Sequence, residues 1–290
     1  MPRVTVVMAT YNWATVLPFS IASVLDQTFT DFELLVVGDG CTDESARVVN
    51  AIGDPRVHWL DLAPRAGHQS GPNNEGIRRA QGEVIAYLGH DDLWLPGHLS
   101  DLVKAIDDGA RLAFSSALMI VPGSRPWVWP PARWSYFPGE WMPPTTIAHD
   151  RSLIDAVGGW RHPRETGELE SESELWQRMT SHSGQPEGPT ELTSLKLPAA
   201  LRRDVYHDRP HHEQEHWLRR IQAGEDLSGQ YRRRSRRSDE LVGAVRSHLR
   251  VRTRLRRLGI LAQAPEPVTD SAEDRWRAQS QFKGADDSTT

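Results

Sequence analysis

The chain is poor in cysteine and in long apolar runs, and each shortage excludes a class of protein. Cys41 is the single cysteine among 290 residues, so an internal disulfide and a multi-cysteine zinc site are excluded. No apolar stretch approaches the length of about 18 residues that a membrane-spanning helix needs. The N-terminus leads straight into apolar residues 4–8, without the basic region and cleavage site of a signal peptide. We therefore expect a protein of the cytoplasm, either free or peripheral to a membrane.

Two nucleotide-binding motifs are also missing. No predicted strand is followed by G-x-G-x-x-G, which argues against a dinucleotide-dependent oxidoreductase. A sugar-phosphate nucleotidyltransferase would hold its triphosphate with a glycine-rich, basic loop directly after the first strand. The corresponding segment, Thr10-Tyr11-Asn12-Trp13, has neither glycine nor a basic residue. This second class is therefore disfavoured as well.

Positive charge is concentrated near the C-terminus of a chain whose net charge is −5. Residues 202–257 contain 16 arginines, no lysine and eight acidic residues, a net charge of +8. Such a segment can meet phosphates, an anionic membrane surface or an acidic partner, and it can equally be a solvated helical face. It has no interleaved aromatic platform of a known type and the whole chain is acidic, so we predict no nucleic-acid binding. We expect this Arg-rich segment to form helices that contact a membrane surface or a second copy of the chain.

Strand and helix signals alternate through the first half of the chain, which is typical of a mostly parallel sheet covered by helices. Strands are predicted over residues 4–9, 32–37, 56–62, 83–88 and 111–121, and helices over residues 14–27, 99–106 and 151–157. Seven prolines and four tryptophans between Pro122 and Pro144 predict no regular structure there. Those tryptophans either cover the core or stack on a sugar.

An acidic pair, Asp91-Asp92, follows the apolar segment 84–88 where a strand should leave its sheet. Open α/β sheets bind ligands at that edge. Two adjacent carboxylates repel each other and are costly to desolvate, so they need a metal ion, an arginine or solvent. Taken alone, the pair is also explained by a solvated turn, because Pro96-Gly97 follows closely.

Three further polar segments can join this pair. Thr10-Tyr11-Asn12 and Gly38-Asp39-Gly40 follow two other predicted strands, and residues 165–174 form an acidic stretch. The ends of parallel strands share one edge of the sheet. The sequence therefore predicts a single site that these segments build together.

The order and spacing of these segments resemble the family-2 glycosyltransferases, which have the GT-A fold. The resemblance spans about residues 3–180 and rests on segments 4–12, 23–29, 32–43, 87–94, 158–160 and 172–178. These are similar to the family's opening strand and to its S-x-L-x-Q-T-x, D-D-G-S-T-D, L-D-x-D-D-x-W, G-G-[FW] and E-D-x-[DE]-L-W-x-R elements. The first fifty residues most resemble a branch that makes bacterial spore-coat polysaccharide.

The resemblance implies an α/β fold with a GT-A type, mostly parallel nucleotide-diphospho-sugar-binding sheet flanked by helices, and a helical arginine-rich C-terminal extension. Residues 1–200 would form the GT-A domain, with a nucleotide-binding half over 1–121 and an acceptor and base half over 122–200. A basic helical extension would cover residues 201–263. A disordered polar tail would follow over residues 264–290.

The resemblance also implies roles for individual residues. Nucleotide binding falls to Thr10, Tyr11, Asn12, Asp39, Asn74 and Asp91. Asp39 would accept a hydrogen bond from the base, which favours UDP or dTDP over GDP. A divalent cation, Mg²⁺ or Mn²⁺, would be held by Asp92 and Asp91, with His207 or His211 as a further ligand. Glu172 would be the general base, with Glu170 and Glu174 as rivals.

Four positions depart from the family's pattern. Gly38 and Gly89 stand where further aspartates are common, Cys41 replaces a usual serine, and Asn73 replaces a common basic residue. Gly89 leaves fewer carboxylates for a metal ion, and Asn73 removes one possible contact to the nucleotide. Metal affinity is the property that these departures reduce most.

Together these observations predict an inverting glycosyltransferase. It would move a sugar from a nucleotide-diphospho-sugar to a hydroxyl of a glycan or small-molecule acceptor. The cation would stabilise charge on the departing diphosphate, and the glutamate would remove the acceptor proton. The alternative is a catalytically degenerate GT-A module that binds nucleotide or glycan without turnover.

Overall fold

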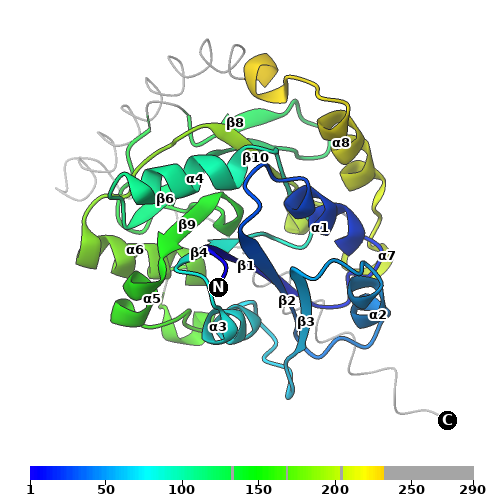
Figure 1. The fold of residues 1–290 in the computed structure, drawn as a ribbon, viewed down its shortest axis with the longest axis horizontal. Coiled ribbons are helices and arrows are strands. Elements are labelled where there is room, and N and C mark those ends of the chain that lie inside the picture. Colours follow the sequence, from blue (N-terminus) through cyan, green and yellow to red (C-terminus); the bar gives the residue numbers. More distant parts are fainter. Residues whose placement is uncertain (132–133, 168, 203–204, 232–290) are drawn as a thin grey trace, which may run out of the picture. The chain divides into compact units, whose positions relative to one another are not determined.

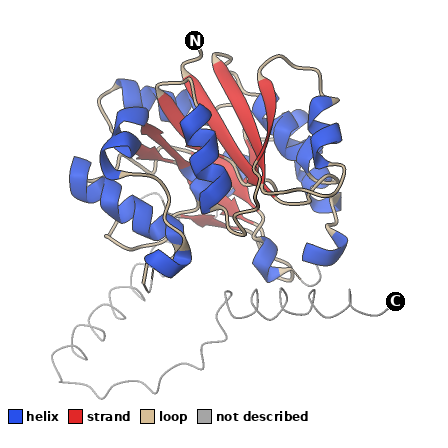
Figure 2. Cartoon of the chain, turned by 90° about the horizontal axis from the view of Figure 1, so that it is seen from below, coloured by secondary structure: helices blue, strands red, loops and turns tan. Residues whose placement is uncertain are grey.

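The computed structural model describes residues 1–231 except 132–133, 168 and 203–204, and leaves out the side chains of residues 206 and 207. Most of the Arg-rich segment and the predicted tail over residues 264–290 therefore lie outside the described residues. The described chain has two β-sheets, with helices on both sides of the larger one (Figures 1 and 2).

The larger sheet has six strands in the order β3-β2-β1-β4-β9-β6. Its strands are β1 (Val4–Thr10), β2 (Phe32–Gly38), β3 (Val57–Asp61), β4 (Val84–Tyr87), β6 (Leu112–Phe114) and β9 (Ile147–Asp150). β1 pairs in parallel with β2 and β4, and β2 with β3, whereas β9 runs antiparallel to both β4 and β6. The prediction of a mostly parallel α/β sheet is confirmed.

Helices and short 3-10 turns connect these strands. The helices are α1 (Leu17–Leu25), α2 (Ser45–Asn50), α3 (Ser70–Arg79), α4 (His98–Asp107), α5 (Arg151–Val157), α6 (Ser171–Ser183), α7 (Val205–Asp208) and α8 (His212–Gln222), and the 3-10 turns are η1 (Pro144–Thr146), η2 (Pro163–Glu165) and η3 (Ala199–Leu201). None of the helices in the described ranges has the length and apolar character that crossing a membrane requires.

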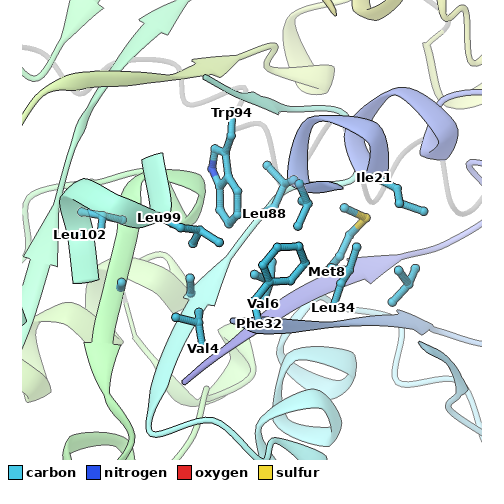
Figure 3. Packing of buried hydrophobic residues seen from close by; sticks show 14 of the residues in the cluster. Val4, Val6, Met8, Ile21, Phe32, Leu34, Leu88, Trp94, Leu99 and Leu102 are labelled. Carbon is cyan, nitrogen blue, oxygen red and sulfur yellow. The ribbon is translucent and has the colours of Figure 1, made fainter. Parts of the chain in front are cut away.

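Strand β1 is apolar except for Thr5 and Thr10, because both of its faces are covered. Val4, Val6 and Met8 pack into one core, together with residues of α1 and α4 (Figure 3). Val7 lies in a second core on the opposite face, with residues of α3, α5 and α6. Full burial of each such aliphatic side chain stabilises the fold by about 1.5–3 kcal/mol. A central strand of this kind holds its C-terminal end in a fixed position.

The predicted strand over residues 111–121 is wrong, because the chain changes sheets in its middle. β6 pairs with β9 in the larger sheet, whereas β7 (Ser116–Met119) pairs with β10 (Leu192–Lys196) and β8 (Trp127–Trp129) in the smaller one. Between β6 and β7, the backbone N–H of Ser115 donates to the carbonyl of Thr146, 2.9 Å away. This hydrogen bond to η1 satisfies the backbone where the chain leaves one sheet for the other.

The smaller sheet has the order β5-β10-β7-β8, with β5 at Leu93–Trp94 and β8 at Trp127–Trp129. β8 corrects the prediction that residues 122–144 lack regular structure. Its three residues lie between Pro126 and Pro130, and an edge strand tolerates neighbouring prolines. Trp217, Leu218 and Ile221 of α8 pack on this sheet. The sheet matters for function because it places the end of β10 beside the acidic pair.

Candidate active site

The ends of the parallel strands meet at one edge of the larger sheet, as the sequence predicts. The backbone N–H of Asp39 donates to the carbonyl of Thr10, 2.8 Å away. His90, beside the acidic pair, places its Nδ1 3.1 Å from the carbonyl of Ala9. Thr10, Asp39 and Asp91 therefore belong to one cluster at the C-terminal ends of β1, β2 and β4.

Asp39 is buried, with 4% of its surface exposed, and its carboxylate is held by the loop before α3. Its Oδ1 accepts from the backbone N–H of Ala66 at 2.6 Å, and its Oδ2 accepts from that of Gly67 at 2.8 Å. Each oxygen keeps one lone pair with which it can accept a further hydrogen bond. The preceding residue, Arg65, lies with its guanidinium carbon 3.6 Å from the centre of the Tyr11 ring. One face of Tyr11 is thus covered by a cation.

Thr10 and Asn12 flank Tyr11 and differ in how their polar atoms are used. Thr10 Oγ1 is buried and has no hydrogen-bond partner among the described residues. Asn12 has a positive φ of 56°, a conformation that asparagine tolerates better than most residues. Its Oδ1 accepts from the N–H of Thr42 at 2.7 Å, and its Nδ2 donates to Thr42 Oγ1 at 3.1 Å. These contacts fix the turn after β1, so the amide of Asn12 positions Tyr11.

Asn74 lies on α3 and is fully engaged by the chain itself. Its Nδ2 donates to the carbonyl of Trp160 at 2.9 Å, and its Oδ1 accepts from the N–H of Trp160 at 2.8 Å. A side chain at Gly159 would collide with this amide, which explains the glycine. The structure thus shows Asn74 holding the turn after α5, and its contact with a nucleotide stays a prediction.

Asp92 is the most buried member of the acidic pair, with 1% of its surface exposed. Its Oδ2 accepts from Lys196 Nζ at 2.9 Å, and its Oδ1 accepts from the backbone N–H of Leu197 at 2.9 Å. The same ammonium lies 4.0 Å from Asp91 Oδ1. The end of β10 therefore supplies a cation to both carboxylates.

The ion pair between Asp92 and Lys196 is charged at neutral pH. Burial raises the pKa of Asp92 to about 6, against the effect of Lys196, which lowers it. Burial acts to lower the pKa of Lys196, but the attraction of Asp92 and Asp91 outweighs it and raises that pKa above its usual value. Each group thus keeps the other ionised in surroundings that disfavour an isolated charge.

Sequence reasoning missed Lys196, although the composition held a signal. The chain has 34 basic residues, and only Lys104, Lys196 and Lys283 are lysines. The rarity of lysine among these basic residues is the one signal that could have drawn attention to position 196. The short strand β10 that carries Lys196 was not predicted, so nothing in the sequence placed this lysine beside Asp92.

The two glycines that depart from the family's acidic pattern have steric causes. A Cβ at Gly89 would lie 2.5 Å from Asp92 Oδ2, so an aspartate does not fit there without moving the acidic pair. A Cβ at Gly38 would collide with the Trp59 ring. The neighbours of both positions thus exclude the additional carboxylates.

The described side chains do not fit a divalent cation at the acidic pair. No group of three or more His, Cys, Asp or Glu side chains with metal-binding geometry occurs among the described residues. Both oxygens of Asp92 are engaged, and the ammonium of Lys196 would repel a second cation. His211 is exposed and its ring stacks on Phe19, with 5.5 Å between centroids. The side chain of His207 lies outside the described part of the chain.

Glu172 lies in the first turn of α6 and is held by two neutral donors. Its Oε1 accepts from Trp141 Nε1 at 3.1 Å, and its Oε2 accepts from Gln69 Nε2 at 3.1 Å. Gln69 follows the loop that binds Asp39, and Glu172 is within electrostatic range of Lys196. Glu172 therefore belongs to the same edge of the sheet. Trp141, from the Trp- and Pro-rich segment, orients this carboxylate.

The two rivals of Glu172 lie in different surroundings. Glu174 is buried and forms ion pairs with Arg161 at 2.8 Å and Arg178 at 2.7 Å. Those two guanidinium groups neutralise it. Glu170 is exposed and immediately precedes α6. Of the three glutamates, Glu172 has the contacts that tie it to the carboxylates at the strand ends.

An open, mostly parallel sheet with acidic side chains at its C-terminal edge defines the GT-A class of fold. The model of the family described as Glycosyl transferase family 2 matches residues 5–161, more than half of the chain. The chain belongs to this family.

Curated and structural relatives agree with this membership. The chain is 30% identical over 129 residues to GalNAc(5)-diNAcBac-PP-undecaprenol beta-1,3-glucosyltransferase of Campylobacter jejuni, which covers 43% of this chain and 41% of that protein. The chain thus spans about two fifths of that relative's length. Residues 1–349 of S. aureus TarS in complex with UDP-GlcNAc match with a TM-score of 0.57 and 16% identity, over 78% of this chain and 68% of that one.

A second solved structure shares the fold over nearly the whole chain. The mannosyltransferase PcManGT from Pyrobaculum calidifontis, in complex with GDP-Man and Mn²⁺, matches with a TM-score of 0.54 and 15% identity. The match covers 98% of this chain and 81% of that one. At such identities, the two structures establish the fold alone.

Proposed function

We propose that this chain transfers a sugar from a nucleoside-diphospho-sugar to an acceptor hydroxyl with inversion at the anomeric carbon. The observation that carries this proposal is the meeting of Asp39, Asp91 and Glu172 at one edge of the sheet. Asp39, after β2, is assigned to the base of the donor. The acidic pair lies after β4, and Glu172 approaches from α6. This order along the edge suits a donor that extends from its base, through its diphosphate, to its sugar.

Glu172 is proposed as the general base. The acceptor oxygen attacks the anomeric carbon while the bond between that carbon and the phosphate oxygen breaks, and its electron pair leaves with the nucleoside diphosphate. The acceptor proton passes to Glu172. Trp141 and Gln69 each occupy one oxygen of this carboxylate, which leaves a lone pair on each oxygen to accept the proton. Attack opposite the leaving group inverts the configuration.

The surroundings of Asp39 support a uracil or thymine base in preference to guanine. Both of its oxygens already accept a backbone N–H, from Ala66 and Gly67. One further N–H, such as N3–H of uracil, can be accepted by a remaining lone pair. Guanine presents two adjacent donors and needs a free lone pair on both oxygens, and the guanidinium of Arg65 lies 3.8 Å from Oδ2, so guanine should bind less well.

The acceptor is proposed to be a hydroxyl of a glycan. Support comes from the Campylobacter jejuni relative, which is named for a glycan linked through diphosphate to undecaprenol. The Mn²⁺ in PcManGT would suggest a divalent cation as the source of positive charge for the leaving group, but the described side chains at the acidic pair fit such a cation poorly. The chain itself holds a positive charge there, the ammonium of Lys196.

Calorimetry and product analysis test the proposal. UDP and dTDP should bind about tenfold or more tightly than GDP. Transfer from UDP-sugars to a panel of glycan acceptors should give products whose anomeric configuration is inverted, as measured by NMR coupling constants. Failure of every nucleotide to bind contradicts the proposal. Nucleotide binding without transfer or donor hydrolysis would instead indicate the catalytically degenerate module.

A further inference from the structure

The acidic pair already holds a cation that belongs to the chain. We propose that Lys196, together with Arg209, supplies the positive charge for the diphosphate of the donor, so that donor binding and transfer need no divalent cation. This inference rests on the proposed function, because it concerns the leaving group of the same reaction. It follows from the poor fit of a divalent cation to these side chains.

Lys196 has the geometry for this task. Its ammonium has three N–H donors. The Asp92 carboxylate, 2.9 Å away, accepts one of them, and Asp91 lies at 4.0 Å, beyond hydrogen-bond distance. The side chain is 17% exposed, so a ligand at the edge of the sheet can still reach it. Two N–H groups therefore stay available for phosphate oxygens.

Arg209 adds a second positive charge near the same strand ends. It follows α7 with a φ of 43°, and its carbonyl accepts from Thr15 Oγ1 at 2.9 Å. Thr15 belongs to the segment after β1, and the guanidinium is within electrostatic range of His90. Its Nε is buried and has no hydrogen-bond partner among the described residues. Arg209 thus keeps an unused N–H donor near the segment after β1 that carries Thr15.

The charges balance as they would with a metal ion. Asp91 and Asp92 contribute two negative charges, and Lys196 and Arg209 contribute two positive ones. A divalent cation bound between two carboxylates gives the same total. The two aspartates and the two cations therefore sum to no net charge, and Lys196 keeps two charged N–H donors that a diphosphate can use.

The direct test is UDP binding by the full chain in EDTA, compared with binding in Mn²⁺ or Mg²⁺. We expect dissociation constants within about twofold of each other and equal transfer rates under both conditions. Titration of Mn²⁺ alone into the protein should give no binding heat. UDP binding that requires Mn²⁺ overturns the role of Lys196 and leaves the proposed function intact. Absence of UDP binding in both conditions contradicts the proposed function itself.

Two lysine variants sharpen the test. Lys196→Met should weaken UDP binding in EDTA by about tenfold or more, because a charged hydrogen bond is lost, while uridine binding changes less than about twofold. Lys104→Met is the matched control, since Lys104 is exposed on α4 and pairs with Asp108. It should leave both affinities unchanged. Equal loss of UDP and uridine binding in Lys196→Met would show a purely structural role and overturn the proposal.

Lys196→Met leaves Asp92 buried without its cation and could fail to fold, so two further variants complete the test. Lys196→Arg keeps the charge and should retain a preference for UDP over uridine in EDTA. Arg209→Gln removes charge without touching a buried ion pair and should weaken UDP binding by about threefold to tenfold. Full UDP affinity in Arg209→Gln would remove Arg209 from the proposal. Metal-dependent UDP binding by Lys196→Arg would contradict the inference as a whole.

Discussion

Asp39 and Asp92 are buried carboxylates at neighbouring strand ends, yet the chain satisfies them in different ways. Asp39 accepts from the backbone N–H groups of Ala66 and Gly67, and the exposed Arg65 lies 3.8 Å from its Oδ2. Asp92 accepts from the ammonium of Lys196, which comes from a different sheet. On the proposed function, the two carboxylates would mark two regions of one site, a base region held mainly by backbone N–H groups and a diphosphate region held by a buried ammonium.

This difference separates the proposed binding of the donor's base from the proposed stabilisation of the leaving diphosphate. At the proposed base region, two backbone N–H groups hold Asp39 and Arg65 lies 3.8 Å from its Oδ2, which leaves a lone pair on Oδ1 to accept a base N–H. At the diphosphate region, positive charge must meet a leaving group that gains negative charge during the reaction. Glu172 joins the two regions, because Gln69 links it to the loop of Asp39 and it lies within range of Lys196.

The largest expected effect separates chemistry from recognition. Glu172→Gln keeps the shape of the side chain and removes the base, so kcat should fall about 10²- to 10⁴-fold with little change in the affinity for UDP. Steady-state kinetics and calorimetry measure the two quantities. Asp39→Asn should do the reverse, raising KM for the donor with kcat nearly kept.

Glu174→Gln is the matched control for the base. Glu174 lies two residues after Glu172 on the same helix, and its replacement removes the ion pairs with Arg161 and Arg178. The free energy of unfolding should therefore fall, while kcat stays within about threefold of the wild-type value. A full kcat in Glu172→Gln would move the base to another residue.

The next effect concerns stability and compares the two buried carboxylates. Lys196→Met should lower the free energy of unfolding by about 3–5 kcal/mol, because it leaves Asp92 charged and unpaired. Asp39→Asn should cost about 1–3 kcal/mol, because one amide hydrogen faces a backbone donor. Urea denaturation measures both. In the double variant Asp92→Asn and Lys196→Met, much of the larger loss should return, and no recovery would contradict the ion pair.

A smaller effect depends on pH and on two buried histidines. Burial lowers the pKa of His98 from 6.5 to about 3 and that of His149 from 6.5 to about 4. Below pH 6.5 these histidines bind protons in the unfolded chain but stay neutral in the folded chain. Their contribution to the free energy of unfolding is therefore complete above pH 6.5 and falls as the pH drops. Each histidine should cost about 2 kcal/mol at pH 5 relative to pH 7.

The two histidines contact different sheets, His98 from α4 and His149 from within β9, which makes them a further comparison. His98 contacts Thr193 of β10 through its Nδ1 at 2.9 Å, whereas His149 contacts the Tyr87 hydroxyl of β4 at 2.9 Å. Thermal unfolding of His98→Gln and His149→Gln between pH 5 and pH 7 should show a shallower dependence than the wild type. An unchanged slope in either variant removes that histidine from the account.

The smallest effect concerns the cation that covers Tyr11. Arg65→Ala exposes the ring face that Arg65 occupies, so UDP and uridine should both bind about twofold to fivefold more tightly. Calorimetry with the two ligands gives the ratio. Weaker binding of both would show that Arg65 itself contacts the base, and a change confined to UDP would assign Arg65 to the diphosphate region.

The base region could be predicted from the sequence because its parts are local. Thr10 ends β1 and Asp39 directly follows β2, two strands rich in apolar residues, and parallel strands bring such ends to one edge. The family resemblance added Glu172 to this edge. The structural roles of Asn12 and Asn74 could not be predicted. Both side-chain amides make hydrogen bonds to residues in turns, at Thr42 and Trp160, and no sequence pattern specifies the geometry of these turns.

The diphosphate region escaped prediction because it depends on pairing between distant segments. Lys196 follows Asp92 by 104 residues and reaches it only through the pairing of β10 with β5 and β7. β10 is five residues long, and the chain switches sheets at Ser115 without a breaking residue. Neither event leaves a periodic signal in the sequence.

A crystal structure of the wild-type protein with UDP in EDTA tests the central claim most directly. The account predicts a base beside Asp39, a diphosphate within hydrogen-bond distance of Lys196 Nζ, and a Glu172 carboxylate that faces the space beyond the diphosphate. UDP bound away from this edge of the sheet, or with its diphosphate out of reach of Lys196, would contradict it.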